Sequence, residues 1–177
     1  MTFAGLAQEI HAANIAAGWW KQIDGVTQPR NIGELLCLVH SEISESDEGS
    51  DGWKMDDKLP HRKMSEVELA DVAIRVLDIL GYYGVNVYPV EGIPRRMMFA
   101  DWLALMHRIT SEAMEGFRKG RDDRGCQSLV RLLWVVEAAA DDYKWDLMGA
   151  IAEKRAFNAQ RADHRPENRA AEGGKKF

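Results

Sequence analysis

Apolar residues recur at intervals of three and four along most of this chain, and that spacing restricts the possible folds more than any other feature of the sequence. Residues three and four apart lie on one face of a helix, so each such stretch predicts an amphipathic helix. The first predicted helix spans 3–17, and the second starts near residue 31 and ends within 46–49. The others span 65–83, 95–117, 126–143 and 146–161. The segment 85–90 hints at a strand but is too short to count as one. We therefore predict an all-α fold, a helical bundle of about six helices.

The predicted helix over 65–83 is apolar on most of its circumference, which is typical of a helix at the centre of a bundle. Its polar residues fall on one narrow stripe that comprises Glu68, Asp71, Arg75 and Asp78. An unpaired charge that is buried in a core is very costly. The stripe is therefore expected to meet another polar surface inside the bundle.

The length of 177 residues suits one domain. We expect a single all-α domain over 1–165, followed by a polar C-terminal tail over 166–177 that is rich in Gly, Lys and Glu. Residues 40–45 can be laid over 110–115, and the apolar positions upstream of the two segments also agree. Residues 91–143 are therefore expected to be a degenerate repeat of a helix pair, or an insertion.

The chain carries 28 acidic and 23 basic residues, which give a formal net charge of −5. A general nucleic-acid binder is usually basic, so we expect no nucleic acid polymer as a partner. Two cysteines, Cys37 and Cys126, cannot form a disulfide framework and indicate a reducing, cytoplasmic setting. No apolar run approaches the roughly 20 residues that span a bilayer. The first ten residues also lack the pattern of a signal peptide, so we expect no membrane partner.

Two pairs of acidic residues fall on neighbouring predicted helices, and the members of each pair are three residues apart. They are Glu42 with Glu45, and Glu68 with Asp71. A short loop joins the two helices, so they should pack antiparallel with the acid pairs face to face. Carboxylates that converge in a core repel one another unless a cation lies among them, and hard oxygen ligands favour Mg²⁺ or Mn²⁺. Since Mg²⁺ usually shares its coordination shell with substrate phosphates, the pattern predicts a site for phosphate chemistry.

These acids also have simpler interpretations, which the sequence leaves open. Ser65 and Glu68 have the spacing of a capping box, in which Glu68 would only cap its helix. Arg75 follows Asp71 by one helical turn and could pair with it. The acid pair on the preceding helix could form a solvated face.

A similar acid pair recurs further along the chain as Glu112 and Glu115. The repeat alignment places Gln127 and Val130 where a partner pair would have to stand. This second copy is therefore expected to hold no metal, and Glu112 and Glu115 are expected to be solvated.

A basic stripe on the last predicted helix is a candidate for binding phosphate oxygens. Lys154, Asn158 and Arg161 lie at positions i, i+4 and i+7, and two cations with an amide donor suit phosphate. An ordinary solvated basic face is the alternative. Three tryptophans lie in predicted loops near the site: Trp19, Trp20 and Trp53. They could stack on a nucleobase, or they could anchor these loops to the core.

A series of short motifs follows along the chain: Gly18-Trp19-Trp20, Gly33-Glu34-Leu35-Leu36, Ser41-Glu42-x-x-Glu45, Glu68-x-x-Asp71, Arg75-Val76-Leu77-Asp78, Ala150-Ile151-x-Glu153-Lys154-x-x-x-Asn158-x-x-Arg161 and a Gly-Gly-Lys-Lys-Phe ending. In order and spacing these motifs resemble those of the MazG-like all-α nucleoside triphosphate pyrophosphatases found in bacteriophages. The resemblance covers most of the chain in pieces.

The resemblance implies that Glu42, Glu45, Glu68 and Asp71 bind Mg²⁺, and that the basic stripe lies near a triphosphate. It implies an enzyme that hydrolyses a (d)NTP to a (d)NMP and pyrophosphate, assembled as a homodimer or homotetramer. Either Glu42 or Glu45 would orient or deprotonate the attacking water. Some phage members favour dGTP, so a purine substrate is our expectation.

The chain departs from the family pattern in two places, and these leave alternatives open. Ser41 stands where the family often has a glutamate, and 91–143 is longer than the corresponding part of a minimal family member. The related dimeric dUTPases also carry duplicated helices, so a dUTP or dCTP pyrophosphatase is one alternative. A non-catalytic helical module that binds nucleotide or a basic partner is another.

Overall fold

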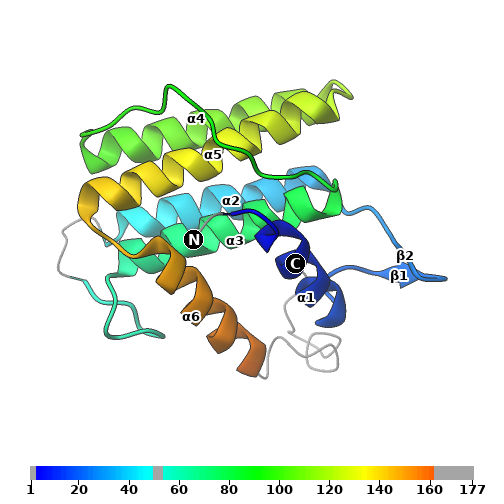
Figure 1. The fold of residues 1–177 in the computed structure, drawn as a ribbon, viewed down its shortest axis with the longest axis horizontal. Helices are drawn as coiled ribbons and strands as arrows, with labels where there is room; N and C mark the ends of the chain where they lie inside the picture. The colour runs from blue at the N-terminus through cyan, green and yellow to red at the C-terminus, as the bar shows by residue number, and fades with distance from the viewer. Residues whose placement is uncertain (1–2, 50–53, 162–177) are drawn as a thin grey trace.

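A computed structural model of the chain describes residues 3–49 and 54–161, and the described part contains six helices and one small sheet (Figure 1). The helices are α1 (Leu6–Ala16), α2 (Ile32–Asp47), α3 (Met64–Tyr82), α4 (Phe99–Arg118), α5 (Asp122–Tyr143) and α6 (Leu147–Gln160). The strands are β1 (Gln22–Ile23) and β2 (Val26–Thr27). The predicted all-α bundle of about six helices is therefore confirmed.

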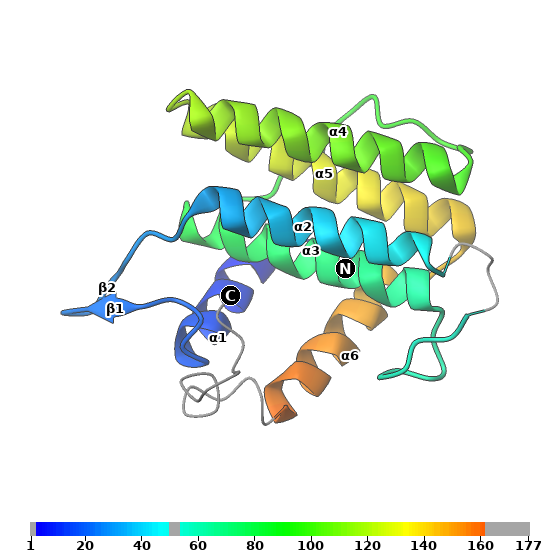
Figure 2. The same cartoon turned by 180° about the vertical axis from the view of Figure 1, so that it is seen from behind.

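The helices α2 and α3 form one hairpin and α4 and α5 form a second, and the two hairpins pack side by side (Figures 1 and 2). α2 contacts α4, and α3 contacts α5. α1 and α6 pack on the opposite side of α3 and diverge from one another (Figure 2). α3 thus contacts four other helices, namely α1, α2, α5 and α6, which is the central position predicted from its apolar circumference.

The segment 91–143, expected to be a repeat or an insertion, supplies α4 and α5 and hence half of the four-helix core. Whether it arose by duplication stays a prediction. The expected C-terminal tail over 166–177 lies outside the described residues. None of the described helices has both the length and the apolar character needed to cross a membrane.

The small sheet lies in a segment that was expected to be a loop. Its strands pair antiparallel across the dipeptide Asp24-Gly25, whose φ angles are +50° and +77°. Two successive residues with positive φ define the two-residue turn that suits the twist of a hairpin, and Asp-Gly is a favoured sequence for it. In the described part of the chain, 85–90 forms no strand.

Asp78 clamps α1 and the loop after it to the central helix. Its two carboxylate oxygens accept a hydrogen bond from Trp20 Nε1 at 3.0 Å, and one of them lies 2.8 Å from His11 Nδ1. The Trp20 ring stacks on Tyr82 with the ring centroids 4.7 Å apart. Since Trp20 is only 2% exposed, it anchors its loop to the core, and the prediction that it stacks on a nucleobase is wrong.

Replacing Asp78 with alanine is expected to lower the free energy of unfolding by about 1–3 kcal/mol, because the buried Trp20 Nε1 loses its acceptor. Urea denaturation followed by tryptophan fluorescence measures the change. Asp57→Ala, at a side chain that is 82% exposed, is the matched control and should leave the midpoint unchanged. Equal midpoints for the two variants would show that the clamp contributes nothing.

Candidate metal centre between α2, α3 and α6

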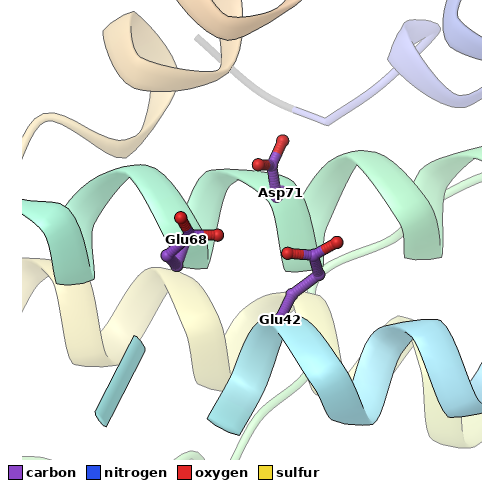
Figure 3. Close-up of side chains that lie close together, drawn as sticks. All are labelled: Glu42, Glu68 and Asp71. Carbon is purple, nitrogen blue, oxygen red and sulfur yellow. The ribbon is translucent and has the colours of Figure 1, made fainter. Parts of the chain in front are cut away.

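Three carboxylates from two helices converge at the middle of the α2–α3 hairpin (Figure 3). Glu42 comes from α2, and Glu68 and Asp71 come from α3. One oxygen atom of each lies within 4.8 Å of the corresponding atom of the other two. Glu42 is 7% exposed and Glu68 only 3%, so these acids are largely removed from water.

A hydrogen bond between the ends of α2 and α3 sets the register that brings these acids together. Ser65 Oγ, in the first turn of α3, donates to the carbonyl oxygen of Ser46 at 2.7 Å. Gly49 permits this approach, because a Cβ atom there would lie 2.8 Å from the Ser65 backbone nitrogen. Glu42 lies one turn before Ser46 and Glu68 one turn after Ser65, so the two carboxylates are level with each other.

The capping-box interpretation of Glu68 is wrong. α3 begins at Met64, so Ser65 is already inside the helix, and its hydroxyl bonds to Ser46 rather than to a free backbone N–H. Lys63 is the N-cap residue and makes no side-chain cap. Glu68 is therefore placed by the cluster and not by helix capping.

Glu45 does not join the cluster, so the prediction that it is a fourth metal ligand is not supported among the described residues. Its side chain is half-buried, and its Oε1 accepts a hydrogen bond from Ser41 Oγ at 2.9 Å. Two side chains that are three residues apart on a helix point in directions that differ by about 60°. Glu42 consequently faces α3, while Glu45 lies at the edge of the contact.

Two basic side chains contact the cluster, one from α3 and one from α6. Arg75 Nε donates to Glu42 Oε1 at 2.5 Å, so Arg75 pairs with Glu42 and not with Asp71, as one alternative had suggested. Lys154 Nζ of α6 lies 2.6 Å from Asp71 Oδ2. Lys154 is 2% exposed, so this residue is part of the site and not of a solvated basic face.

The raised pKa values of Glu68 and Asp71 indicate that full ionisation of the three carboxylates is unfavourable. Burial, then repulsion by Asp71, raises the pKa of Glu68 to about 8 against the attraction of Lys154. Burial also raises the pKa of Asp71 to about 6, although Lys154 acts in the opposite direction. For Lys154, burial lowers the pKa, but the carboxylates of Asp71, Glu68 and Asp56 together outweigh it and the net shift is upward. A further positive charge at this position would relieve the repulsion.

The donor set suits a hard divalent cation. Three carboxylates supply only oxygen ligands, which Mg²⁺ and Mn²⁺ prefer. Arg75 and Lys154 together offset at most two of the three negative charges. The raised pKa values of Glu68 and Asp71 therefore fit a site that is completed by a cation.

The remaining members of the basic stripe lie beside the cluster and not within it. Asn158 and Arg161 line a cavity between α1 and α6. The Arg161 guanidinium lies 5.9 Å from the centroid of the Phe157 ring. Trp19 lines the same cavity, whereas Trp53 lies outside the described residues.

The second acid pair lies on α4, where Glu112 is exposed and Glu115 is half-buried. Glu115 forms salt bridges with Arg118 at 2.8 Å and Lys119 at 2.6 Å on the surface of α4. Glu112 lies 3.7 Å from Arg108. Neither acid belongs to a cluster that could hold a metal among the described residues.

Two further residues that the sequence did not single out support the site. Asp56 is 3% exposed and adds to the upward shift in the pKa of Lys154. Arg62 contacts α6 at two points: it lies 3.3 Å from Asp146 at the N-cap and 2.8 Å from Glu153, the residue before Lys154. Asp56 and Arg62 lie in a polar loop without periodicity, so only tertiary contacts could reveal them.

No family model matches the sequence, and neither a curated protein nor a solved structure matches it. The resemblance to MazG-like pyrophosphatases accordingly rests on the motifs alone and stays a prediction.

Proposed function

We propose that this chain is a Mg²⁺-dependent nucleoside triphosphate pyrophosphatase that hydrolyses a (d)NTP to a (d)NMP and pyrophosphate. The observation that carries the proposal is the convergence of Glu42, Glu68 and Asp71 within 4.8 Å, beside a buried lysine. Arg75 and Lys154 offset at most two of the three negative charges, and a buried charge that stays unbalanced opposes folding. A Mg²⁺ ion bound together with a nucleoside triphosphate would balance the remaining negative charge of the cluster.

Glu42, Glu68 and Asp71 would hold the Mg²⁺ ion, for which Mn²⁺ is a possible substitute. When bound, such an ion offsets the negative charge of the phosphates and favours attack at phosphorus. Arg75 fixes the orientation of Glu42 through their hydrogen bond. Lys154 Nζ lies 2.6 Å from Asp71 Oδ2 and would supply a positive charge for a phosphate oxygen bound beside Asp71.

Glu45 is the better of the two glutamates for activating water. It lies one turn from Glu42 on the same helix but outside the cluster, so its carboxylate is not committed to the ion. Ser41 orients it by donating a hydrogen bond to Oε1. A general base must be near the reacting water and must still be able to take a proton.

The substrate preference and the assembly are further parts of the proposal. The motif resemblance favours a purine substrate, dGTP in particular, and dUTP or dCTP is the alternative. It also favours a homodimer or homotetramer in the cytoplasm.

Purified full-length protein incubated with Mg²⁺ and each of the dNTPs in turn tests the reaction. Chromatographic separation should show one dNMP and one pyrophosphate for each dNTP consumed. Release of single phosphates would place the attack at the γ-phosphate and contradict the proposal. Absence of turnover, together with no rise in Tm on adding Mg²⁺ and a non-hydrolysable dNTP, would favour a non-catalytic interaction module.

A further inference from the structure

Two histidines meet between the two helical hairpins, where α2 and α4 lie side by side (Figure 2). Nδ1 of His40 on α2 lies 2.7 Å from Nδ1 of His107 on α4. The ring planes differ by only 13°, and the ring centroids are 5.0 Å apart. Since the centroid separation exceeds the nitrogen separation by about the width of one imidazole ring, the rings lie edge to edge. Their Nδ1 atoms are therefore aimed at one another.

This contact fixes which nitrogens carry hydrogen. A contact of 2.7 Å needs one donor and one acceptor, so in the neutral pair one Nδ1 carries a hydrogen and the other presents its lone pair. Neutral imidazole is the commonest metal ligand in proteins. If the donating ring gives its Nδ1 hydrogen to solvent and takes one up at Nε2, both Nδ1 atoms present lone pairs to the same point, and neither ring changes its charge.

A small movement of the two side chains would admit a metal ion between them. Zinc–nitrogen bonds of about 2.0–2.1 Å at a tetrahedral angle place two nitrogen ligands about 3.3–3.4 Å apart. The two Nδ1 atoms would therefore have to separate by about 0.6–0.7 Å from 2.7 Å. Both histidines are only half-buried, so solvent reaches them and the rings have room to turn.

The same face of α2 offers a third ligand. A Cβ atom on Gly33 would lie 3.6 Å from Met114 Cε, and seven residues further along α2 His40 meets His107. The two helices thus run antiparallel, and Cys37 stands between these two contacts. Among the described residues its thiol is not grouped within 4.8 Å of both rings. It is exposed, however, and rotation about its Cα–Cβ bond between staggered rotamers changes the direction of the sulfur atom.

We propose that His40, His107 and Cys37 form a binding site for a transition-metal ion of the Zn²⁺ class, with water as the fourth ligand. Imidazole nitrogen and thiolate sulfur suit such ions, whereas Mg²⁺ prefers the oxygen ligands of the carboxylate cluster. The Cys37 thiol would release its proton to solvent as it binds. The bound ion would tie the α2–α3 hairpin to the α4–α5 hairpin. This site is independent of the proposed reaction.

Titration of the reduced, full-length protein with Co²⁺, a coloured substitute for Zn²⁺, tests the proposal. Four-coordinate Co²⁺ absorbs visible light, and a bond to thiolate adds a charge-transfer band in the near ultraviolet. With excess Mg²⁺ present to compete for the carboxylate cluster, the wild-type protein should bind one Co²⁺ per chain and show both signals. Zn²⁺ should displace the Co²⁺ and raise Tm, because an ion that binds only the folded state stabilises it.

Four variants assign the ligands. His40→Gln and His107→Gln should each weaken Co²⁺ binding about 10²-fold or more. Cys37→Ser should lose the charge-transfer band. His61→Gln, at a histidine whose side chain is 63% exposed, is the matched control and should bind as the wild-type protein does.

The result that would overturn the proposal is the absence of Co²⁺ and Zn²⁺ binding by the wild-type protein, or undiminished binding by both histidine variants. A charge-transfer band that survives in Cys37→Ser would overturn the assignment of Cys37. Glutamine can still hydrogen-bond to the remaining histidine, so both histidine variants should fold, which circular dichroism checks. If they do not fold, Cys37→Ser, at an exposed position, still decides. No measurement here uses a nucleotide, so failure of this site leaves the proposed reaction intact.

Discussion

The Asp71→Asn variant is expected to lose about 10³-fold in kcat/KM for dNTP hydrolysis. Asp71 is one of the three clustered carboxylates and the partner of Lys154, so its replacement changes both the proposed metal site and the buried lysine beside it. Asparagine has nearly the same shape but no charge, and it cannot replace a carboxylate as a ligand of Mg²⁺. Pyrophosphate release at pH 8 measures the loss, and a melt with and without Mg²⁺ should show that the metal no longer raises Tm.

Two further glutamate variants, Glu45→Gln in α2 and Glu48→Gln at its C-cap, show whether the loss of activity comes from loss of the metal. Glu45→Gln should lower kcat about 10²-fold, because it removes the proposed general base, but it should still gain stability on adding Mg²⁺. Glu48→Gln, at a side chain that is 62% exposed, should behave like the wild-type protein. Wild-type turnover by Asp71→Asn would show that the cluster is not the catalytic metal site. Loss of the Mg²⁺ effect in Glu45→Gln would restore Glu45 as a ligand.

The Glu68→Gln variant is expected to be more stable than the wild-type protein at pH 8.5 in EDTA, by about 2–4 kcal/mol. Burial and the neighbouring Asp71 raise the pKa of Glu68 from 4.5 to about 8, so the folded state binds this proton more tightly than the unfolded chain. The stability that Glu68 contributes is therefore complete below pH 4.5 and is lost as the pH rises through about 8. A neutral glutamine does not ionise and escapes the loss.

Urea denaturation of both proteins from pH 5 to pH 8.5 measures this difference, which should grow as the pH rises. The pair His40 and His107 acts in the opposite direction, because burial lowers the pKa of each ring. Its contribution is present above pH 6.5 and is lost as the pH falls, but it is common to both proteins and cancels in the comparison. If the free energies of unfolding of the two proteins change in parallel with pH, the ionised form of Glu68 does not destabilise the fold.

Mg²⁺ should reverse the order of the two proteins at pH 8.5. A ligand that binds only the folded state raises its stability, and the wild-type protein keeps the complete set of carboxylates. The control is the same melt in EDTA without added divalent cation, in which the wild-type protein should again be less stable than Glu68→Gln. An equal rise in Tm for both proteins would place Mg²⁺ elsewhere on the chain.

Much of the fold could be predicted because it depends on local periodicity. The central position of α3 follows from an apolar circumference, which needs neighbours on several sides to exclude water. Asn31 marks the start of α2 in the sequence, and its Oδ1 accepts a hydrogen bond from the Gly33 backbone nitrogen at 2.9 Å. The short hairpin at Asp24-Gly25 was missed because two-residue strands have no periodicity to detect.

The candidate site was only partly predictable, since spacing gives direction along one helix but not the partner across a contact. Glu68 and Asp71 were identified because they interrupt an apolar helix. Glu45 shares the spacing of that pair, yet it lies at the edge of the α2–α3 contact. Trp20 stands in a loop beside the motifs, and only Asp78 on another helix shows that it is a core anchor.

The sequence by itself determined which residues form helices and which helix carries acids on its buried side, because both depend on the order of neighbouring side chains. The tertiary structure decided how many of those acids meet and which basic side chains balance them. Ser65 donates a hydrogen bond to Ser46 and sets the register, and that register brings Glu42 but not Glu45 into the cluster with Glu68 and Asp71. Lys154 meets Asp71 across 83 residues of sequence because α6 packs over α3, a contact that no local pattern encodes.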